Sequence, residues 1–271
     1  MASTRIADAF ARARAENRVA LITYVVPGHP TPAESAGVFD AMVAGGADII
    51  EVGIPFSDPL ADGTTIQRVA FEALQNGMTP RGCMDFARDA RARHPDTPIL
   101  FMTYLNPVLS YGTKAFAADA AAGGVDGVIL TDMPPEEAGV IQPTFTAAGL
   151  DLIFLVAPTS SEHRLKVIAA HAGGFVYCVS VTGVTGARSE LAADLPEFLA
   201  RVRKVTGLPL TVGFGISRRE HIQALLGLAD GAVVASALMN LINETRAADR
   251  PRVIRERVET LVGRRKPEAI A

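Results

Sequence analysis

Eight short apolar runs recur along the chain at wide intervals. They do not alternate cleanly between polar and apolar positions. Continuous apolarity of this kind is typical of strands that are buried on both faces, as in a parallel sheet. The runs predict strands at residues 19–25, 47–53, 98–104, 126–131, 151–156, 174–180, 208–213 and 231–236.

Helical patterns fill the intervals between these runs. The apolar residues of 195–202, for example, are spaced as one face of a helix. The sequences Thr31–Glu34, Thr159–Glu162 and Ser217–Glu220 each place Ser or Thr three residues before Glu, the capping box of a helix start. Glycines stand just before most of the strands, where helix C-termini are expected. We therefore expect a helix between consecutive strands.

Eight strands that alternate with helices over about 250 residues favour an α/β fold of the (β/α)8 barrel type, a TIM barrel. An internal echo supports a repeated unit, because A-G-G-x-D precedes both the second strand, at 44–48, and the fourth, at 122–126. A doubly wound open sheet is the alternative, and it is disfavoured because no G-x-G-x-x-G follows the first strand. We expect residues 1–271 to form a single barrel domain, with an N-terminal helix in 1–17 and a loose tail at 264–271.

Composition excludes several classes of function. The net charge is −3 and Trp is absent, so neither a basic face nor a base-stacking platform is indicated. The two cysteines lie far apart and have no metal or disulfide spacing. The N-terminus lacks the apolar core of a signal peptide, and no apolar run approaches the roughly 20 residues that span a membrane. We expect a soluble, cytoplasmic protein.

The most informative single residue is Glu51, which stands in a strand otherwise made of Ile and Val. Burial of an unpaired carboxylate is costly or raises its pKa. Glu51 is therefore either a structural carboxylate capped by backbone N–H groups or a general acid/base that works near neutral pH. Asp62, in the following loop, can lie over the same mouth of the barrel. Asp58 is expected at a turn or at a surface contact.

The last three strands end in features of a phosphate site. Barrels often bind phosphate with the loops after strands seven and eight and the start of a short helix. Gly183, Gly186, Gly213 and Gly215 allow close approach of the backbone, and Ser236 follows the last strand. The alternative is that these glycines only form tight turns between strand and helix.

Absent residues narrow the chemistry further. None of the four lysines falls in a predicted strand, which disfavours a Schiff-base aldolase. The five histidines are scattered, which disfavours a metal site. We expect His29 at the rim of the mouth and the other four, His94, His163, His171 and His221, exposed on helices or at helix ends. Carboxylate acid–base chemistry on a phosphorylated substrate, without a cofactor, remains.

The segments that carry these residues resemble the tryptophan synthase α-subunit family. "EVGIPFSDPLADGTTIQ", "MTYLNPVLSYG", "GVDGVILTDMPPEE", "VSVTGVTGAR" and "GFGIS" are similar to family blocks in the family's order and spacing. The resemblance covers roughly residues 5–262 and implies a barrel with an extra N-terminal helix. It implies retro-aldol cleavage of indole-3-glycerol phosphate to indole and glyceraldehyde 3-phosphate, a step of L-tryptophan biosynthesis. The alternatives are a stand-alone lyase that releases free indole, a partner that has lost turnover, and another phosphate-binding barrel.

The resemblance also implies a role for each matching residue. Glu51 is the general acid/base, Asp62 accepts the indole N–H, Tyr177 assists or packs beside Glu51, and Thr185 bonds Asp62. The apolar indole pocket comprises Tyr24, Met102, Leu130 and Leu155. The phosphate and its surroundings are held by Gly186, Gly213, Phe214, Gly215, Ala235 and Ser236.

A partner is implied as well. The family pairs with a β-subunit as an α2β2 heterotetramer, and pyridoxal phosphate is expected only in that subunit. This chain is expected to hold no cofactor and no metal. The implied contact surface includes Pro55, Asp58, Asn106 and Pro107. Thr64 replaces a usual proline and is expected to loosen the loop that holds Asp62, and Ala235 replaces a usual glycine.

Overall fold

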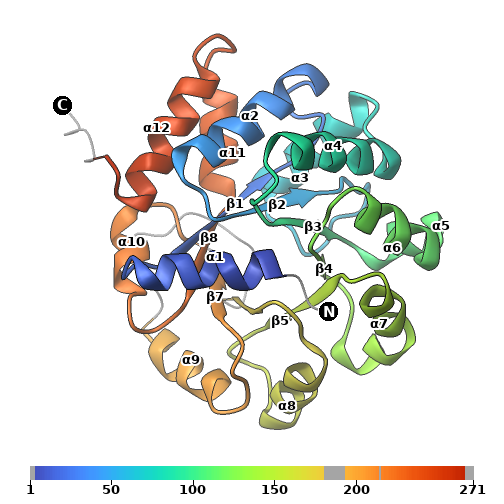
Figure 1. Cartoon of the computed structure of the whole chain (residues 1–271), viewed down its shortest axis with the longest axis vertical. Helices are drawn as coiled ribbons and strands as arrows, with labels where there is room; N and C mark the ends of the chain where they lie inside the picture. Colours follow the sequence, from blue (N-terminus) through green and yellow to red (C-terminus); the bar gives the residue numbers. More distant parts are fainter. Residues whose placement is uncertain (1–3, 180–192, 214, 266–271) are drawn as a thin grey trace.

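Eight parallel strands close into a barrel in which each strand pairs with its neighbours in sequence and β8 pairs with β1 (Figure 1). The computed structural model describes residues 4–179, 193–213 and 215–265. The strands are β1 (Ala20–Val25), β2 (Ile49–Gly53), β3 (Ile99–Thr103), β4 (Gly127–Leu130), β5 (Asp151–Val156), β6 (Val176–Val179), β7 (Leu210–Gly213) and β8 (Gly231–Val234). The predicted barrel is confirmed, and each strand lies within its predicted run.

Helices surround the barrel on its outside, except α1, which lies across one end (Figure 1). They are α1 (Thr4–Ala15), α2 (Pro32–Gly45), α3 (Thr64–Gln75), α4 (Pro80–Arg93), α5 (Leu105–Tyr111), α6 (Thr113–Ala122), the 3-10 turn η1 (Pro135–Glu137), α7 (Ala138–Ala147), α8 (Glu162–His171), α9 (Leu195–Arg203), α10 (Arg219–Ala224), α11 (Ser236–Glu244) and α12 (Arg250–Val262). None of the helices within these described ranges is long and apolar enough to cross a membrane.

One of the three predicted capping boxes is confirmed. The Thr31 side chain accepts the N–H of Glu34 at the start of α2, and the two side chains also bond each other. The prediction at 159–162 is wrong in position, because Ser161 caps α8. The prediction at 217–220 is also wrong, because α10 begins after Arg218, whose side chain makes no capping bond. Tertiary packing sets where these shorter helices begin, and the boundary shifts by one or two residues.

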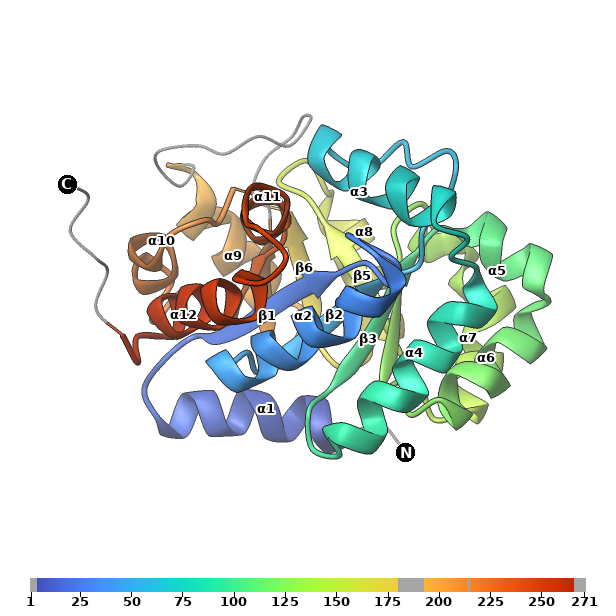
Figure 2. The same ribbon diagram turned by 90° about the horizontal axis from the view of Figure 1, so that it is seen from above.

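The barrel interior is filled by side chains at every second position of the strands, as the two-residue period of a strand requires. Ile22, Ile49, Leu100, Ile129 and Ile153 belong to this inner cluster. Helix α1 closes one end, because its residues Ile6, Ala9, Phe10 and Ala13 join the same cluster. Figure 1 shows α1 lying across that end, and Figure 2 shows it opposite α3.

A ring of aspartates joins α1 to the barrel. Asp48, Asp126 and Asp230 stand immediately before β2, β4 and β8. Each accepts a backbone N–H at the start of the preceding strand, with N–O distances of 2.8, 2.9 and 2.9 Å. The echo A-G-G-x-D is thereby explained for the first two of these aspartates, which cap β1 and β3.

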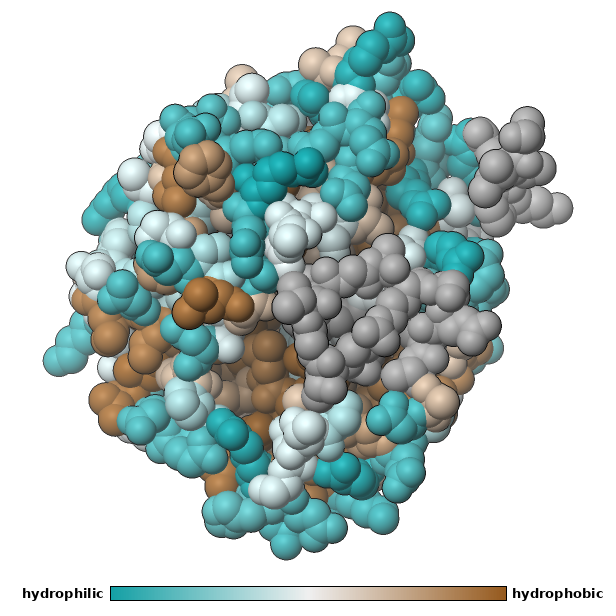
Figure 3. Space-filling model, turned by 180° about the vertical axis from the view of Figure 1, so that it is seen from behind, coloured by the Kyte–Doolittle hydropathy of each residue, from teal (hydrophilic) through white to brown (hydrophobic). Residues whose placement is uncertain are grey.

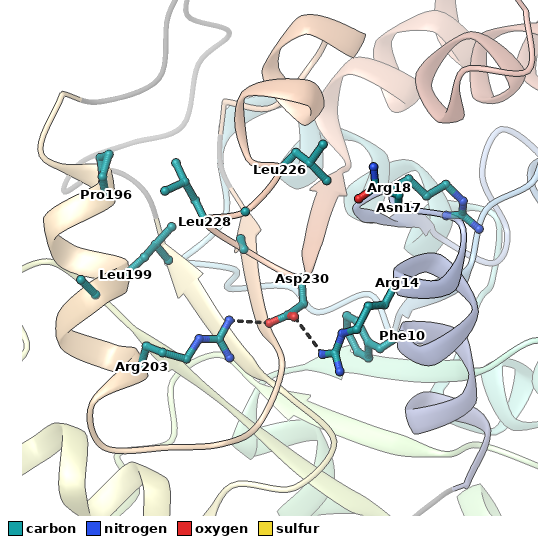
Figure 4. A pocket seen from close by; sticks show the side chains of 13 residues that line it. Phe10, Arg14, Asn17, Arg18, Pro196, Leu199, Arg203, Leu226, Leu228 and Asp230 are labelled. Atoms are coloured by element: carbon teal, nitrogen blue, oxygen red, sulfur yellow. Dashed lines mark hydrogen bonds and ion pairs between the residues drawn. The ribbon is translucent and has the colours of Figure 1, made fainter.

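Arginines complete the pairing of these aspartates. Arg5 and Arg14 of α1 pair with Asp126 and Asp230. Arg18, just after α1, binds Asp48 through both terminal nitrogens of its guanidinium group. Figure 4 shows Asp230 between Arg14 of α1 and Arg203 of α9. This end of the barrel is therefore tied together by charge pairs rather than arranged for chemistry, as is usual for the N-terminal end of such strands.

Candidate active site

The opposite end of the barrel is hollowed. Figure 3 shows this face, on which apolar side chains surround a depression. A cavity of about 50 Å³ lies at the mouth. It is lined by Tyr24, Glu51, Asp62, Gly63, Ile66, Met102, Tyr177, Gly215, Ile216, Val233, Ala235 and Ser236. The cavity thus brings together the two carboxylates that the sequence singled out.

Glu51 lies on β2, two residues after Ile49, so its side chain points to the barrel interior. It is 0% exposed, and neither carboxylate oxygen has a hydrogen-bond partner among the described residues. Burial without a compensating donor raises the pKa of Glu51 to about 8. The carboxyl group is therefore mostly protonated at neutral pH. A capped structural carboxylate would show the opposite shift.

Two tyrosines flank Glu51, and each depends on a glycine of the neighbouring strand. Tyr24 is the residue of β1 that pairs in register with Glu51. A Cβ atom on Gly53 would overlap the Tyr24 hydroxyl, and one on Gly213 would overlap the ring of Tyr177. Burial raises the pKa of both tyrosines well above the usual value, so both are neutral. Gly213 was predicted to admit phosphate, and its visible effect here is to make room for Tyr177.

Asp62 reaches the mouth from the loop between β2 and α3. Burial raises its pKa to about 6, and a hydrogen bond with Tyr104 works in the opposite direction. The Asp62 N–H donates to Pro59 O at 3.0 Å, and its carbonyl accepts from Gln67 Nε2 at 2.8 Å. The loop that holds Asp62 is thus braced on both sides of this residue, with Thr64 as the first residue of α3.

The predicted phosphate end adjoins the start of α11. Ser236 is the first residue of this helix, and Ala235 precedes it with φ −109°, a region that any residue adopts. The backbone therefore tolerates alanine where the family usually has glycine. Gly215 has φ +81°, a left-handed conformation that favours glycine. Free N–H groups in the first turn of a helix suit an anion, and here the first turn opens toward the cavity.

Some predicted residues lie elsewhere. Leu130 and Leu155 line a neighbouring cavity of about 420 Å³ instead of the mouth cavity. Gly183, Thr185, Gly186 and Phe214 lie outside the described residues. Four lining residues were missed by the sequence reading, namely Gly63, Ile66, Ile216 and Val233. Val233 could have been predicted, because it stands two residues before Ala235 on the same face of the predicted strand, and it belongs to the inner cluster.

The predicted partner surface is only partly exposed. Asp58 and Asn106 are exposed, whereas Pro55 and Pro107 are buried. The two prolines therefore offer little side-chain surface in this chain, and the partner surface stays a prediction. Pro107 packs within α5, where it is buried together with Val108.

The expectations for the histidines were confirmed only in part, since His94 and His171 do stand at the ends of α4 and α8 but are half-exposed. His29 is buried, and its Nδ1 lies 2.9 Å from Glu72 Oε2 of α3, so it does not line the mouth. Of the other four, only His163 is exposed, and His221 is buried in α10. In the part of the chain that the structure describes, no group of three His, Cys, Asp or Glu residues could hold a metal ion.

Fold and site together define a (β/α)8-barrel enzyme with two carboxylates of different acidity at the carboxyl ends of its strands. Residues 10–269 match the family model described as tryptophan synthase alpha chain. The chain belongs to this family.

Relatives and solved structures agree. The tryptophan synthase alpha chain of Roseiflexus sp. (strain RS-1) is 50% identical over 241 residues, which cover 89% of this chain and 92% of the relative. That of Roseiflexus castenholzii is 49% identical over 259 residues, covering 93% and 99%. A chain of Mycobacterium tuberculosis tryptophan synthase is 40% identical, covers 97% of this chain and 98% of its own length, and superimposes with a TM-score of 0.88.

Membership in this family confirms the predicted class and reaction. The protein is a carbon–carbon lyase of tryptophan biosynthesis, and it catalyses the α reaction, in which indole-3-glycerol phosphate is cleaved to indole and glyceraldehyde 3-phosphate.

Proposed function

We propose that Glu51 and Asp62 divide the acid–base work of this cleavage. The observation that carries the proposal is their difference in one shared cavity, because the pKa of Glu51 is raised to about 8 and that of Asp62 only to about 6. Near pH 7, Glu51 is then mostly a neutral acid and Asp62 mostly an anion. Two carboxyl groups with separated pKa values can hold separate roles in one reaction.

In the proposed reaction, Glu51 donates its proton to the indole carbon that carries the glycerol phosphate side chain. The indolenine forms, and the bond between that carbon and the side chain breaks as the electron pair returns to the ring. The side-chain hydroxyl becomes the aldehyde, and its proton passes to the Glu51 carboxylate. Glu51 therefore ends the cycle protonated, and no outside acid or cofactor is consumed. Tyr177, neutral and beside Glu51, packs against it or assists it.

Asp62 supports the charged intermediate. Protonation of the ring carbon places positive charge on the indole N–H, and the Asp62 anion accepts that N–H and opposes the charge. The interaction is stronger in the intermediate than in the substrate, which is the condition for it to speed the chemical step. The resemblance adds Thr185 as the partner of Asp62.

The remaining residues place the substrate. We assign the indole ring to the apolar side chains of Tyr24 and Met102, with Leu130 and Leu155 in the neighbouring cavity. The mouth cavity has a volume of about 50 Å³ and the neighbouring cavity one of about 420 Å³, and the proposed indole site takes its side chains from both. We assign the phosphate to the start of α11, with the residues Gly213, Gly215, Ala235 and Ser236, and with Gly186 and Phe214 from the resemblance.

The partner is the family's pyridoxal-phosphate β-subunit, in an α2β2 assembly in the cytoplasm, while this chain itself holds no cofactor. Support comes from the exposed surface beside the mouth. Leu60 is 93% exposed and follows Asp58 in the loop between β2 and α3. Leu109 is 54% exposed and follows Asn106 in α5. Large exposed apolar residues near polar ones are typical of a docking surface.

The roles of the carboxylates are tested with purified chain, indole-3-glycerol phosphate and an assay for indole. Asp62→Asn removes the charge and places an amide near the indole N–H. We expect kcat to fall by about a hundredfold or more, with KM changed by less than tenfold. A variant with a normal rate would remove Asp62 from the mechanism.

The docking surface is tested with Leu60→Asp. Leu226→Asp is the matched control, because Leu226 is also an exposed leucine, at 50%, but it lines a pocket with α1 at the other end of the barrel. We expect only Leu60→Asp to weaken the complex with the β-subunit and the stimulation of indole formation. Equal effects of the two variants would contradict the assignment. A wild-type rate that the β-subunit does not stimulate would favour the stand-alone enzyme.

A further inference from the structure

We propose that Tyr104 is a positioning residue that fixes Asp62 over the mouth of the barrel, because its hydroxyl accepts the N–H of Ala61, the residue before Asp62, while its ring packs on Phe56 of the same loop. This inference rests on the proposed role of Asp62. Tyr104 follows β3 directly and is 5% exposed. It does not line the mouth cavity, so it acts on the substrate only through Asp62.

The hydrogen-bond directions at the hydroxyl follow from the partners. The Ala61 N–H can only donate, so the Tyr104 oxygen accepts it, at 3.0 Å. The Asp62 carboxylate, once ionised, can only accept. The single hydrogen of the Tyr104 hydroxyl is therefore available to the Asp62 carboxylate, and a bond of this kind lowers the pKa of Asp62. One hydroxyl thus acts on two consecutive residues of the loop, on the backbone of Ala61 and on the carboxylate of Asp62.

The ring provides a second point of attachment. The rings of Tyr104 and Phe56 lie with centroids 5.4 Å apart and planes tilted by 37°. Phe56 lies just before the largely exposed turn 57–60 and Asp62 lies just after it, so Tyr104 supports the loop on both sides of this turn. Tyr104 is itself anchored, since the next N–H, that of Leu105, donates to Asp132 Oδ1 at 2.7 Å. The junction of β3 and α5 therefore serves as a fixed support for the loop.

The bond also favours the ionised form of Asp62. A donor to a carboxylate stabilises its charge and lowers its pKa, here against burial, which raises it. The other titratable groups of the cavity are Tyr24 from β1, Glu51 from β2 and Tyr177 from β6. The described residues that α3, β3, β8 and the segments after β7 and β8 contribute to the lining do not titrate, and no described Arg, Lys or His lines the cavity. Among the described residues, Tyr104 is the hydrogen-bond donor that lowers the pKa of Asp62.

The test compares Tyr104→Phe with Tyr111→Phe. Tyr111 is a matched control because its hydroxyl also bonds a carboxylate, Asp119 at 2.5 Å, but on α5 and α6, outside the mouth lining. The measurement is kcat/KM for indole formation from pH 5 to 9. For Tyr104→Phe we expect a loss of about tenfold at pH 8. We also expect the acid limb to move up by about one pH unit, so that the loss at pH 6 exceeds the loss at pH 8 by about fivefold.

Tyr111→Phe is expected to leave both the rate and the acid limb unchanged. An unshifted acid limb in Tyr104→Phe would overturn the proposal, whether or not the rate falls, because a merely structural role changes the rate without changing the pKa of Asp62. Tyr104→Leu, which also removes the ring, should lose more activity than Tyr104→Phe. Failure of the underlying role is distinguishable, because Asp62→Asn would then remain active.

Discussion

At the two ends of the barrel, the pKa values of carboxylates removed from solvent are shifted in opposite directions. Asp230, before β8, is partly buried, and this burial by itself would raise its pKa. Hydrogen bonds from Arg203 and from the Leu210 N–H outweigh that effect, and its pKa lies below the usual value. Glu51, on β2, has no such partner among the described residues, and burial alone acts on it. Burial is therefore common to both ends, and the neighbouring donors decide whether a carboxylate is structural or reactive.

The largest effect is expected for Glu51→Gln. The amide keeps the shape of the side chain but cannot donate or accept the catalytic proton, so kcat/KM should fall by about a thousandfold or more. Substrate binding should change little. The measurement is indole formation, and substantial residual turnover would contradict the acid/base role.

The same variant should be more stable than the wild type at alkaline pH. The folded-state pKa of Glu51, about 8, lies above its unfolded value of 4.5, so the wild type loses stability as the pH rises through that window. The Gln variant has no such loss, and its free energy of unfolding at pH 9 should be higher by at most about 5 kcal/mol. Denaturant unfolding at pH 4 and pH 9 measures the difference, which should shrink at the lower pH.

The opposite outcome is expected for Asp48→Ala at the other end. The side chain accepts the Leu21 N–H and pairs with Arg18 through two bonds, and it is 6% exposed. Its removal takes away two bonds of the partly buried Arg18 guanidinium, which keeps Glu16 as a partner, and leaves the Leu21 N–H without its acceptor. The free energy of unfolding should fall by about 3 kcal/mol. The value of kcat/KM should stay within about twofold of the wild type.

A suitable control for this variant is Asp85→Ala, whose partner Arg88 is exposed on the surface of α4. Exposed pairs contribute little, so the cost should be below about 0.5 kcal/mol. If Asp48→Ala lost activity but not stability, the division of the barrel into a structural and a reactive end would be wrong.

A smaller effect, but a direct one, is the pH dependence of the wild type. Asp62 must be ionised, and it loses its proton as the pH rises through about 6. Glu51 must be protonated, and it loses its proton as the pH rises through about 8. The plot of kcat/KM against pH should therefore be bell-shaped with limbs near these values. A rate that still rises above pH 9 would exclude Glu51 as the acid.

The barrel could be predicted from the sequence because buried parallel strands need continuous apolarity, which the eight runs have. The importance of Glu51 could also be predicted, because a carboxylate among Ile and Val is conspicuous. The role of Gly53 could not be predicted from the sequence. A glycine at a strand end has no evident function until the structure places Tyr24 beside it. Ile66 and Ile216 were hidden for a similar reason, because apolar residues on helices and loops look alike in sequence whether or not they line a cavity.

The role of the three aspartates Asp48, Asp126 and Asp230 could not be predicted from the sequence either. The repeated pattern A-G-G-x-D was visible at 44–48 and 122–126. Its structural role was not, because the arginines that pair with its aspartates lie far away in sequence. His29 was misplaced because position at a strand end does not fix the direction of a side chain. Its ring is buried, with Nδ1 at 2.9 Å from Glu72 Oε2 of α3.

The smallest effect is expected for Thr64→Pro, which restores the residue usual in the family. Thr64 is exposed at the first position of α3, where the missing N–H of proline has no cost. Gly63 before it has φ −76° and ψ 164°, which suits a residue that precedes proline. Proline should therefore raise the free energy of unfolding by about 0.5 kcal/mol by restricting the unfolded chain.

Activity separates this variant from changes at Asp62 itself. Bonds from Tyr104, Gln67 and Pro59 already hold the loop, so Thr64→Pro should leave kcat/KM and its acid limb unchanged. The measurements are thermal unfolding and the pH profile of indole formation. A marked gain in kcat/KM would mean that Thr64 does loosen Asp62, and that the bonds around the loop do not suffice to hold it at the reactive end.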